Sequence, residues 1–125
     1  KPDIIIDFVF EDGLLFITVQ NIGNEPALKV KTTFDKPFTG LDGSQQTSLL
    51  PLFRTIEFLA PHKEIRTLLD SSTSYFRRRQ PTKIRAIITY RDRKNVQYSA
   101  AITHDLSIYN DIAYVDPATN ERGKE

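Results

Sequence analysis

Residues 14–34 read LLFITVQNIGNEPALKVKTTF, two alternating segments separated by a turn. Apolar residues occupy every second position of residues 14–20, which predicts a strand with one apolar face. Residues 27–34 alternate in the same way, and their lysines fall on the face that we expect to meet water. The residues that we expect to face inward are Leu28, Val30, Thr32 and Phe34.

The turn between these segments, residues 21–26, must reverse the chain within a few residues. Asn21 and Gly23 tolerate left-handed backbone, and Pro26 cannot continue the strand pairing. We therefore expect Gly23 to have a positive φ.

The same two-residue period continues through the rest of the chain. It predicts five further strands, at residues 3–10, 55–59, 64–69, 83–90 and 96–106. Each strand has an apolar face that must pack against another. The sequence therefore predicts an all-β fold, a seven-stranded antiparallel immunoglobulin-like or fibronectin type III-like β-sandwich, with a closed barrel as the alternative. The predicted core includes Ile17, Val30, Ile88 and Tyr98.

The segments between the strands complete the predicted organisation. Residues 35–54 and 70–82 are expected to be loops, although the apolar residues 49–53 are expected to dock on the core. We assign one immunoglobulin-like domain to residues 1–115 and a polar C-terminal tail to residues 116–125.

The composition excludes several classes of site. The chain has no Cys, so it has no disulfide framework, no thiolate metal site and no Cys nucleophile. Its formal net charge of +1 gives no field strong enough to gather nucleic acid or an anionic membrane. There is no apolar run approaching the roughly 20 residues of a membrane-spanning helix.

Two groups of surface residues are candidate partner contacts. The first is Tyr75 with the run Arg77, Arg78 and Arg79, and the second is Arg91, Arg93 and Lys94. Arginine and aromatic residues are enriched at protein-binding hot spots, and the same combination serves single-stranded nucleic acid. The alternative is a solvated loop in which Phe76 plugs the core. The sandwich places the two groups at opposite ends, which weighs against one nucleic-acid groove.

Few residues suggest catalysis or metal binding. His104, Asp105 and Ser107 resemble a nucleophilic set, but neighbours on a strand point to opposite faces, so His104 and Asp105 cannot pair by adjacency. The only other histidine, His62, lies in a predicted turn beside a lysine. Calcium ligands are conceivable in the loops, from Asp12, Asp42 and Asp116, or from Asp35, Asp42 and Asp70 if they converge. We assign no catalytic, cofactor-binding or metal-ligating residue.

Residues 16–27, FITVQNIGNEPA, carry a family resemblance. They resemble the "V-x-N-x-G-N-x-P-A" strand–turn–strand of prokaryotic immunoglobulin-like domains, best known from the bacterial cell-adhesion-related (CARDB) domains. Residues 59–65 and 88–92 are also similar, although His62 replaces the usual glycine. The resemblance implies a spacer or interaction module, often in envelope or membrane-tethered proteins, and brings no catalytic residue.

The sequence therefore predicts a non-enzymatic interaction or spacer module without a cofactor. We expect it to be the soluble part of a larger or membrane-anchored prokaryotic protein, with any membrane tether outside this chain and a protein as its partner. One alternative is nucleic-acid or polyanion binding through the basic loops. Another is a carbohydrate-binding sandwich, for which Tyr109 and Tyr114 are the aromatics expected outside the core.

Overall fold

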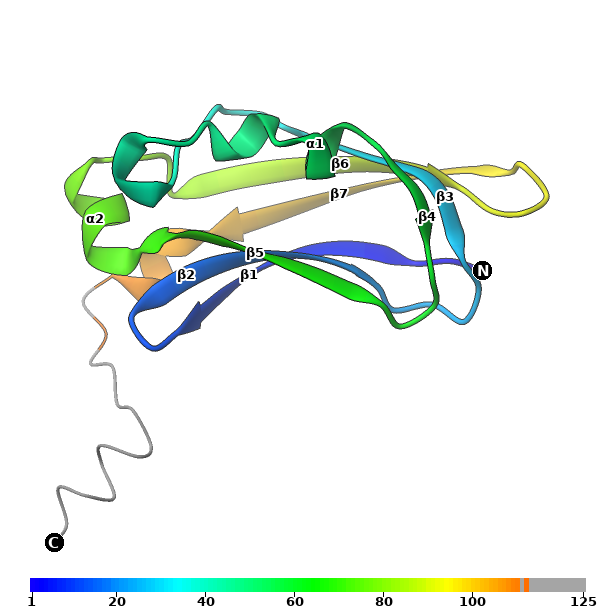
Figure 1. Cartoon of the computed structure of the whole chain (residues 1–125), viewed down its shortest axis with the longest axis horizontal. Helices are drawn as coiled ribbons and strands as arrows, with labels where there is room; N and C mark the ends of the chain where they lie inside the picture. Colours follow the sequence, from blue (N-terminus) through cyan, green and yellow to red (C-terminus); the bar gives the residue numbers. More distant parts are fainter. Residues whose placement is uncertain (111, 113–125) are drawn as a thin grey trace, which may run out of the picture.

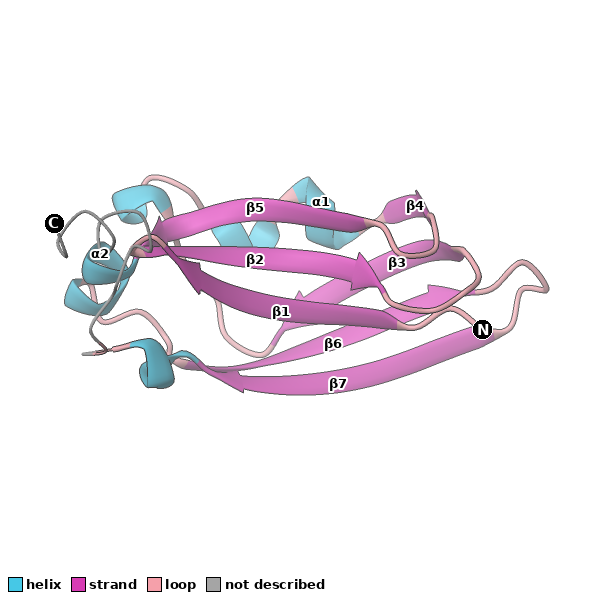
Figure 2. Cartoon of the chain, turned by 90° about the horizontal axis from the view of Figure 1, so that it is seen from below, coloured by secondary structure: helices cyan, strands magenta, loops and turns pink. Residues whose placement is uncertain are grey.

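The computed structural model describes residues 1–110 and 112, which form two antiparallel sheets packed face to face (Figures 1 and 2). One sheet has the order β1 (Ile4–Glu11), β2 (Leu14–Asn21) and β5 (Glu64–Ser71). The other has the order β4 (Ile56–Leu59), β3 (Ala27–Phe34), β6 (Lys83–Arg91) and β7 (Gln97–Asp105). The predicted all-β sandwich of seven antiparallel strands is confirmed. The fourth strand joins β3 rather than β5, unlike the constant-type immunoglobulin arrangement.

The core lies between the two sheets, as the alternation of apolar and polar residues predicts. Ile17 of β2 and both Val30 and Ile88 of the facing sheet are at most 1% exposed, as predicted. Tyr98 is only half-buried, because β7 is an edge strand, and its ring stacks on Tyr90 at 5.5 Å. The predicted boundary at residue 115 and the tail at 116–125 lie outside the described residues.

Strand β3 departs from the expected alternation at its start. The register against β6 shifts between Leu28 and Lys31, and Lys29 has a φ of 53°. This bulge inserts one extra residue and reverses the facing of the residues before it. Ala27 is therefore buried opposite Leu59, while Leu28 is only half-buried. The prediction that Leu28 faces inward with Val30 is wrong.

The expected positive φ of Gly23 is also wrong. Gly13, in the β1–β2 hairpin, has a φ of 74°, whereas Gly23 is not among the glycines with positive φ. Glycine is needed at position 23 for space, because a Cβ there would lie 2.5 Å from the Lys1 carbonyl oxygen. The buried Asn21 holds this turn, accepting hydrogen bonds from the Gly23 amide at 3.0 Å and the Asp3 amide at 3.2 Å.

One open side of the sandwich, between β3 and β5, is covered by residues 35–54 (Figure 2). This segment contains η1 (Leu41–Gly43), η2 (Thr47–Leu49) and α1 (Pro51–Arg54). Phe38 and Phe53 from the segment are buried at 1% and 2% exposure, so the prediction that residues 49–53 dock on the core is confirmed. After β5, the chain forms α2 (Ser72–Arg77), where the sequence predicted a loop.

The opposite side lies between the edge strands β1 and β7. His104 of β7 forms a hydrogen bond through Nε2 to the Ile6 carbonyl oxygen, 2.8 Å away. In η3 (Leu106–Tyr109), the Tyr109 hydroxyl donates to the Phe8 carbonyl oxygen at 3.4 Å. Side chains thus satisfy carbonyls along the free edge of β1, which an added strand would otherwise use.

The long axis of the molecule separates two ends (Figure 1). Lys1 lies at the end that carries the β6–β7 hairpin, and the η3 and α2 helices lie at the other end. Among the described residues, no helix has the length and apolar character needed to span a membrane.

Candidate functional site

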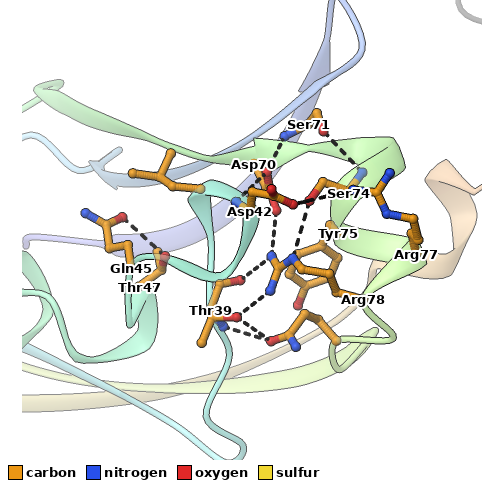
Figure 3. Close-up of polar contacts among 12 residues, drawn as sticks. Thr39, Asp42, Gln45, Thr47, Asp70, Ser71, Ser74, Tyr75, Arg77 and Arg78 are labelled. Atoms are coloured by element: carbon orange, nitrogen blue, oxygen red, sulfur yellow. Dashed lines mark hydrogen bonds and ion pairs between the residues drawn. The ribbon is translucent and has the colours of Figure 1, made fainter.

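The α2 corner holds the first predicted contact group (Figure 3). Ser71 caps α2, because its Oγ accepts a hydrogen bond from the Ser74 amide at 3.1 Å. The cap starts a helical turn that directs Tyr75 inward, where it is 0% exposed. Its hydroxyl donates to the Pro81 carbonyl oxygen at 2.6 Å, and burial raises its pKa. Tyr75 is therefore not a surface contact, contrary to the prediction.

Arg78 is also withdrawn from the surface. Its Nη2 lies 2.5 Å from Asp70 Oδ2, and the two side chains are 17% and 6% exposed. The same guanidinium donates to both the carbonyl and the hydroxyl oxygen of Thr39, at 3.1 and 2.5 Å. Asp70, Thr39 and Ser74 thus engage this guanidinium within the chain, so Arg78 does not present the free surface side chain that the sequence predicted.

The charge of Asp70 is maintained by this network. Burial alone would raise its pKa, but hydrogen bonds from Arg78, from Ser74 and from the amides of Asp42 and Ser71 outweigh burial and lower it. The amide bond from Asp42 is 3.2 Å long. Because Asp42 and Thr39 belong to the segment of residues 35–54, the ion pair ties that segment to the end of β5.

The remaining arginines of the run, Arg77 and Arg79, are exposed. Arg77 lies 3.4 Å from Asp42 Oδ1, with both side chains more than 70% exposed, a geometry that contributes little to stability. The contiguous sequence RRR thus contains one internal ion-pair partner between two solvated side chains.

The second predicted group lies at the other end, on the β6–β7 hairpin (Figure 1). Asp92 organises this hairpin, because its carboxylate accepts from the amides of Lys94 and Val96, both at 2.9 Å. Arg91 donates to the Asn95 side chain at 3.2 Å, while Arg93 and Lys94 are exposed. The predicted separation of the two basic groups is confirmed.

His104, Asp105 and Ser107 do not form a catalytic arrangement. His104 bonds to the Ile6 backbone, as described above, whereas Asp105 caps η3. Asp105 Oδ1 accepts from the Ser107 amide at 3.0 Å and from its hydroxyl at 2.6 Å. The expectation that His104 and Asp105 do not pair is confirmed.

The predicted carboxylate groups are used in other ways. Among residues 1–110 and 112, no three His, Asp or Glu side chains are grouped to hold a metal ion. Asp42 and Asp70 do converge, but on arginines, while Asp35 accepts the Arg85 amide at 2.9 Å. Asp116 lies outside the described part of the chain.

A groove that the sequence did not predict lies along the edge of β3. Strand β4 is four residues long, and its pairing with β3 ends at Val30 and Ile56. Beyond that point, residues 31–34 of β3 are flanked by η2 and α1 instead of a strand. The groove between them has a volume of about 550 Å³, within the usual range for ligand sites. Its apolar lining is Phe34, Pro37, Leu49, Leu50 and Phe53.

The walls of this groove are fixed by the core beneath it. The rings of Phe34 and Phe53 meet edge to face at 5.0 Å. Ser48 holds η2 in place, since its Oγ accepts from the Phe38 amide at 3.1 Å and donates to the Phe38 carbonyl at 3.2 Å. Leu49, by contrast, is 58% exposed at the mouth.

The rim of the groove is basic. Lys31, Lys36 and Arg54 line it and are exposed, and no Asp or Glu is among its lining residues. Lys36 Nζ donates to the Lys83 carbonyl oxygen at 3.0 Å. We call this arrangement the β3 groove.

Comparison with known proteins identifies the family. A family model described as a domain of unknown function, DUF8453, matches residues 1–110. The chain belongs to the DUF8453 family. No curated protein and no solved structure matches it.

One sequence feature of this DUF8453 domain corresponds to the β3 groove. Residues 49–53 read LLPLF, a dense apolar run inside an otherwise polar segment. Only Phe53 of that run is fully buried, and Leu49 points its apolar surface toward solvent. The sequence predicts only that this run docks on the core, because the spacing of its apolar residues does not show which of them remain exposed.

Proposed function

We propose that this domain is a non-enzymatic interaction or spacer module and that its contact surface is the β3 groove. The observation that carries the proposal is the combination of an exposed apolar site with a rim of three cations, Lys31, Lys36 and Arg54. A buried apolar centre with a polar, charged rim is the usual anatomy of a protein-binding surface.

The groups that suggested chemistry give less support to an enzyme. His104 bonds to the backbone of β1, and Asp105 and Ser107 bond to each other where they cap η3. The placement of Lys1 and η3 at opposite ends of the long axis supports the spacer side of the proposal (Figure 1).

The two alternatives from the sequence have weaker support. Nucleic-acid binding through Arg77, Arg79, Arg93 and Lys94 would need a strand that reaches both ends of the molecule. A carbohydrate platform would need free aromatic faces, but the Tyr109 ring stacks on Phe10 at 5.7 Å. Tyr114 lies outside the described residues. The resemblance to CARDB-like envelope domains, with a tether outside this chain, remains our proposal for the cellular setting.

Site-specific photo-crosslinking in the cells that produce the protein tests the function. Benzoylphenylalanine in place of Leu49 probes the groove, and the same group in place of Val96, which is 48% exposed on the far hairpin, is the matched control. We expect a discrete protein adduct from position 49 that disappears with Arg54→Glu. Equal labelling at both positions, or no adduct at either, contradicts the proposal.

A further inference from the structure

We propose that the β3 groove binds an extended, acidic segment of a partner protein, which adds as a strand beside Thr32 and Phe34. This inference rests on the proposed function and specifies the partner's chemistry and binding mode. In this mode, backbone hydrogen bonds provide affinity and alternate side chains provide specificity.

The backbone of β3 offers the first argument. The Asp35 amide donates to the Arg85 carbonyl oxygen at 3.0 Å, so this pair is hydrogen-bonded across β3 and β6. Hydrogen-bonded and non-hydrogen-bonded pairs alternate in antiparallel sheets, so Phe34 and Thr32 turn their amide and carbonyl groups to the opposite edge. Val30 has the same parity, and on that edge it is paired with Ile56 of β4.

Strand β4 begins at Ile56, so Thr32 and Phe34 have no strand partner on this edge. The chain enters β4 from α1, and the Thr55 amide donates to the Pro51 carbonyl oxygen at 3.4 Å rather than to β3. An incoming strand would therefore enter the groove between α1 and residues 31–34 of β3. The contrast with β1 is direct, since His104 and Tyr109 already occupy carbonyls on the free edge of that strand.

The groove provides the second argument. Alternate side chains of an added strand point to one face, so every second residue of the partner would enter the apolar space. Phe34 and Leu50 are half-buried there and Leu49 is 58% exposed, which leaves apolar surface for Val- or Leu-sized side chains to cover.

The rim provides the third argument. Lys31, Lys36 and Arg54 surround the groove, and two acids near this region are already engaged. Asp35 accepts the Arg85 amide, and Glu57 pairs with Lys29. Glu or Asp residues on the partner would complement this charge, steer association and exclude basic segments. A fatty acid or lipid would meet the same charge and apolar lining, but it would leave the backbone groups of Thr32 and Phe34 without partners.

Peptide binding to the full 125-residue chain tests the inference. The probe is a fluorescein-labelled octapeptide that alternates Glu with Val or Leu, measured by fluorescence polarisation. Its controls are a peptide with Lys in place of Glu and one N-methylated at alternate positions on the pairing edge. We expect each change to weaken binding by about tenfold or more, because each removes charge complementarity or strand pairing.

Protein variants locate the site. Lys31→Glu and Arg54→Glu should each weaken binding by about tenfold, while Arg93→Glu, which makes the same charge change on the distant hairpin, should change it less than about twofold. Amide chemical-shift changes should centre on Thr32 and Phe34. Circular dichroism and thermal melts verify that the variants are folded.

The outcomes separate this inference from the proposed function. If the N-methylated or Lys peptide binds as tightly as the probe, or if Arg93→Glu weakens binding as much as Arg54→Glu, the strand-addition inference is wrong. Two results together would assign the groove to an anionic amphiphile instead. Decanoate would displace the probe, and the N-methylated peptide would bind as tightly as the probe. A groove-specific crosslink at position 49 without peptide binding would preserve the interaction function and overturn only the binding mode.

Discussion

The α2 corner and the β3 groove both present basic residues, but the fold uses them differently. At the corner, Arg78 is enclosed by Asp70 and Thr39 from distant parts of the chain. At the groove, Lys31 and Arg54 are exposed beside uncovered apolar surface. Whether a basic residue is available to a partner therefore depends on which acidic residues the fold places beside it. The number of charged residues in a stretch of sequence does not reveal that placement.

Removing the internal ion pair should produce the largest effect. Arg78→Ala leaves the buried Asp70 carboxylate without its cation, and breaking such a pair typically costs about 3–5 kcal/mol. We expect a loss of unfolding free energy of that order in urea titrations. Arg79→Ala, one residue along, should change it by less than about 0.5 kcal/mol, because that side chain is exposed. Similar losses in the two variants would contradict the assignment of Arg78 as an internal partner.

Gly40 tests how tightly residues 35–54 are held against β5. Its backbone is extended, with a φ of −129°, but a Cβ would overlap the Leu69 carbonyl oxygen. Gly40→Ala should therefore destabilise the domain by about 1–3 kcal/mol through overpacking. Gly13→Ala is a useful comparison, since no atom lies within 4 Å of its added Cβ but its φ of 74° is unfavourable for alanine. An unchanged melting temperature for Gly40→Ala would show that the segment can move away from β5.

The pH dependence of stability distinguishes the corner from the solvated groove. The pKa of folded Asp70 lies below its ordinary value of 3.8, so the folded state binds the proton less readily than the unfolded chain. The resulting stabilisation is fully present above that ordinary value and is lost as the pH falls through the folded pKa. Asp70→Asn should therefore be less stable than the wild type at neutral pH, with a gap that narrows in acid.

Denaturant titrations of both proteins from pH 7 to pH 3 measure this gap. Hydrogen bonding also lowers the pKa values of Asp92 and Asp105, but both residues are present in each protein, so their contributions cancel in the difference. A gap that stays constant across this range would show that the Asp70 charge does not stabilise the fold.

The smallest effect on stability is expected at the groove. Leu49→Ser and Arg54→Glu alter side chains that are exposed, and such changes usually shift unfolding free energy by less than about 0.5 kcal/mol. Chemical denaturation measures this shift. Truncating a core residue typically costs about 2 kcal/mol or more of unfolding free energy. A loss of that size in either variant would mean that the groove is part of the core rather than a binding surface.

The strands were predictable because their signals are local. Alternation, glycine and proline set each strand to within about two residues of its observed bounds. The errors arose where another segment intervened. Glycine is required at position 23 because the Lys1 backbone lies close to it. The bulge at Lys29 turns Ala27 inward in place of Leu28.

The site was less predictable for the same reason. The cap of α2 could have been found, because a serine precedes the helix and the side chain of Ser71 bonds three residues ahead. That cap directs Tyr75 into the core, whereas the neighbouring run of three arginines suggested a surface position for it. The β3 groove depends on where β4 begins and on how residues 35–54 cross the edge of β3, and neither is encoded in a local pattern.

The opposite placement of Lys1 and η3 has a mechanical consequence (Figure 1). A pull on Lys1 and Tyr109 acts along the strands, so the β1–β2 ladder, which pairs Ile4 with Asn21 through Glu11 with Leu14, is sheared as a unit rather than opened one bond at a time. Resistance to force follows the unfolding barrier rather than the equilibrium stability. Tension along this axis is therefore shared by many hydrogen bonds at once, and the open edge of β3 lies parallel to it.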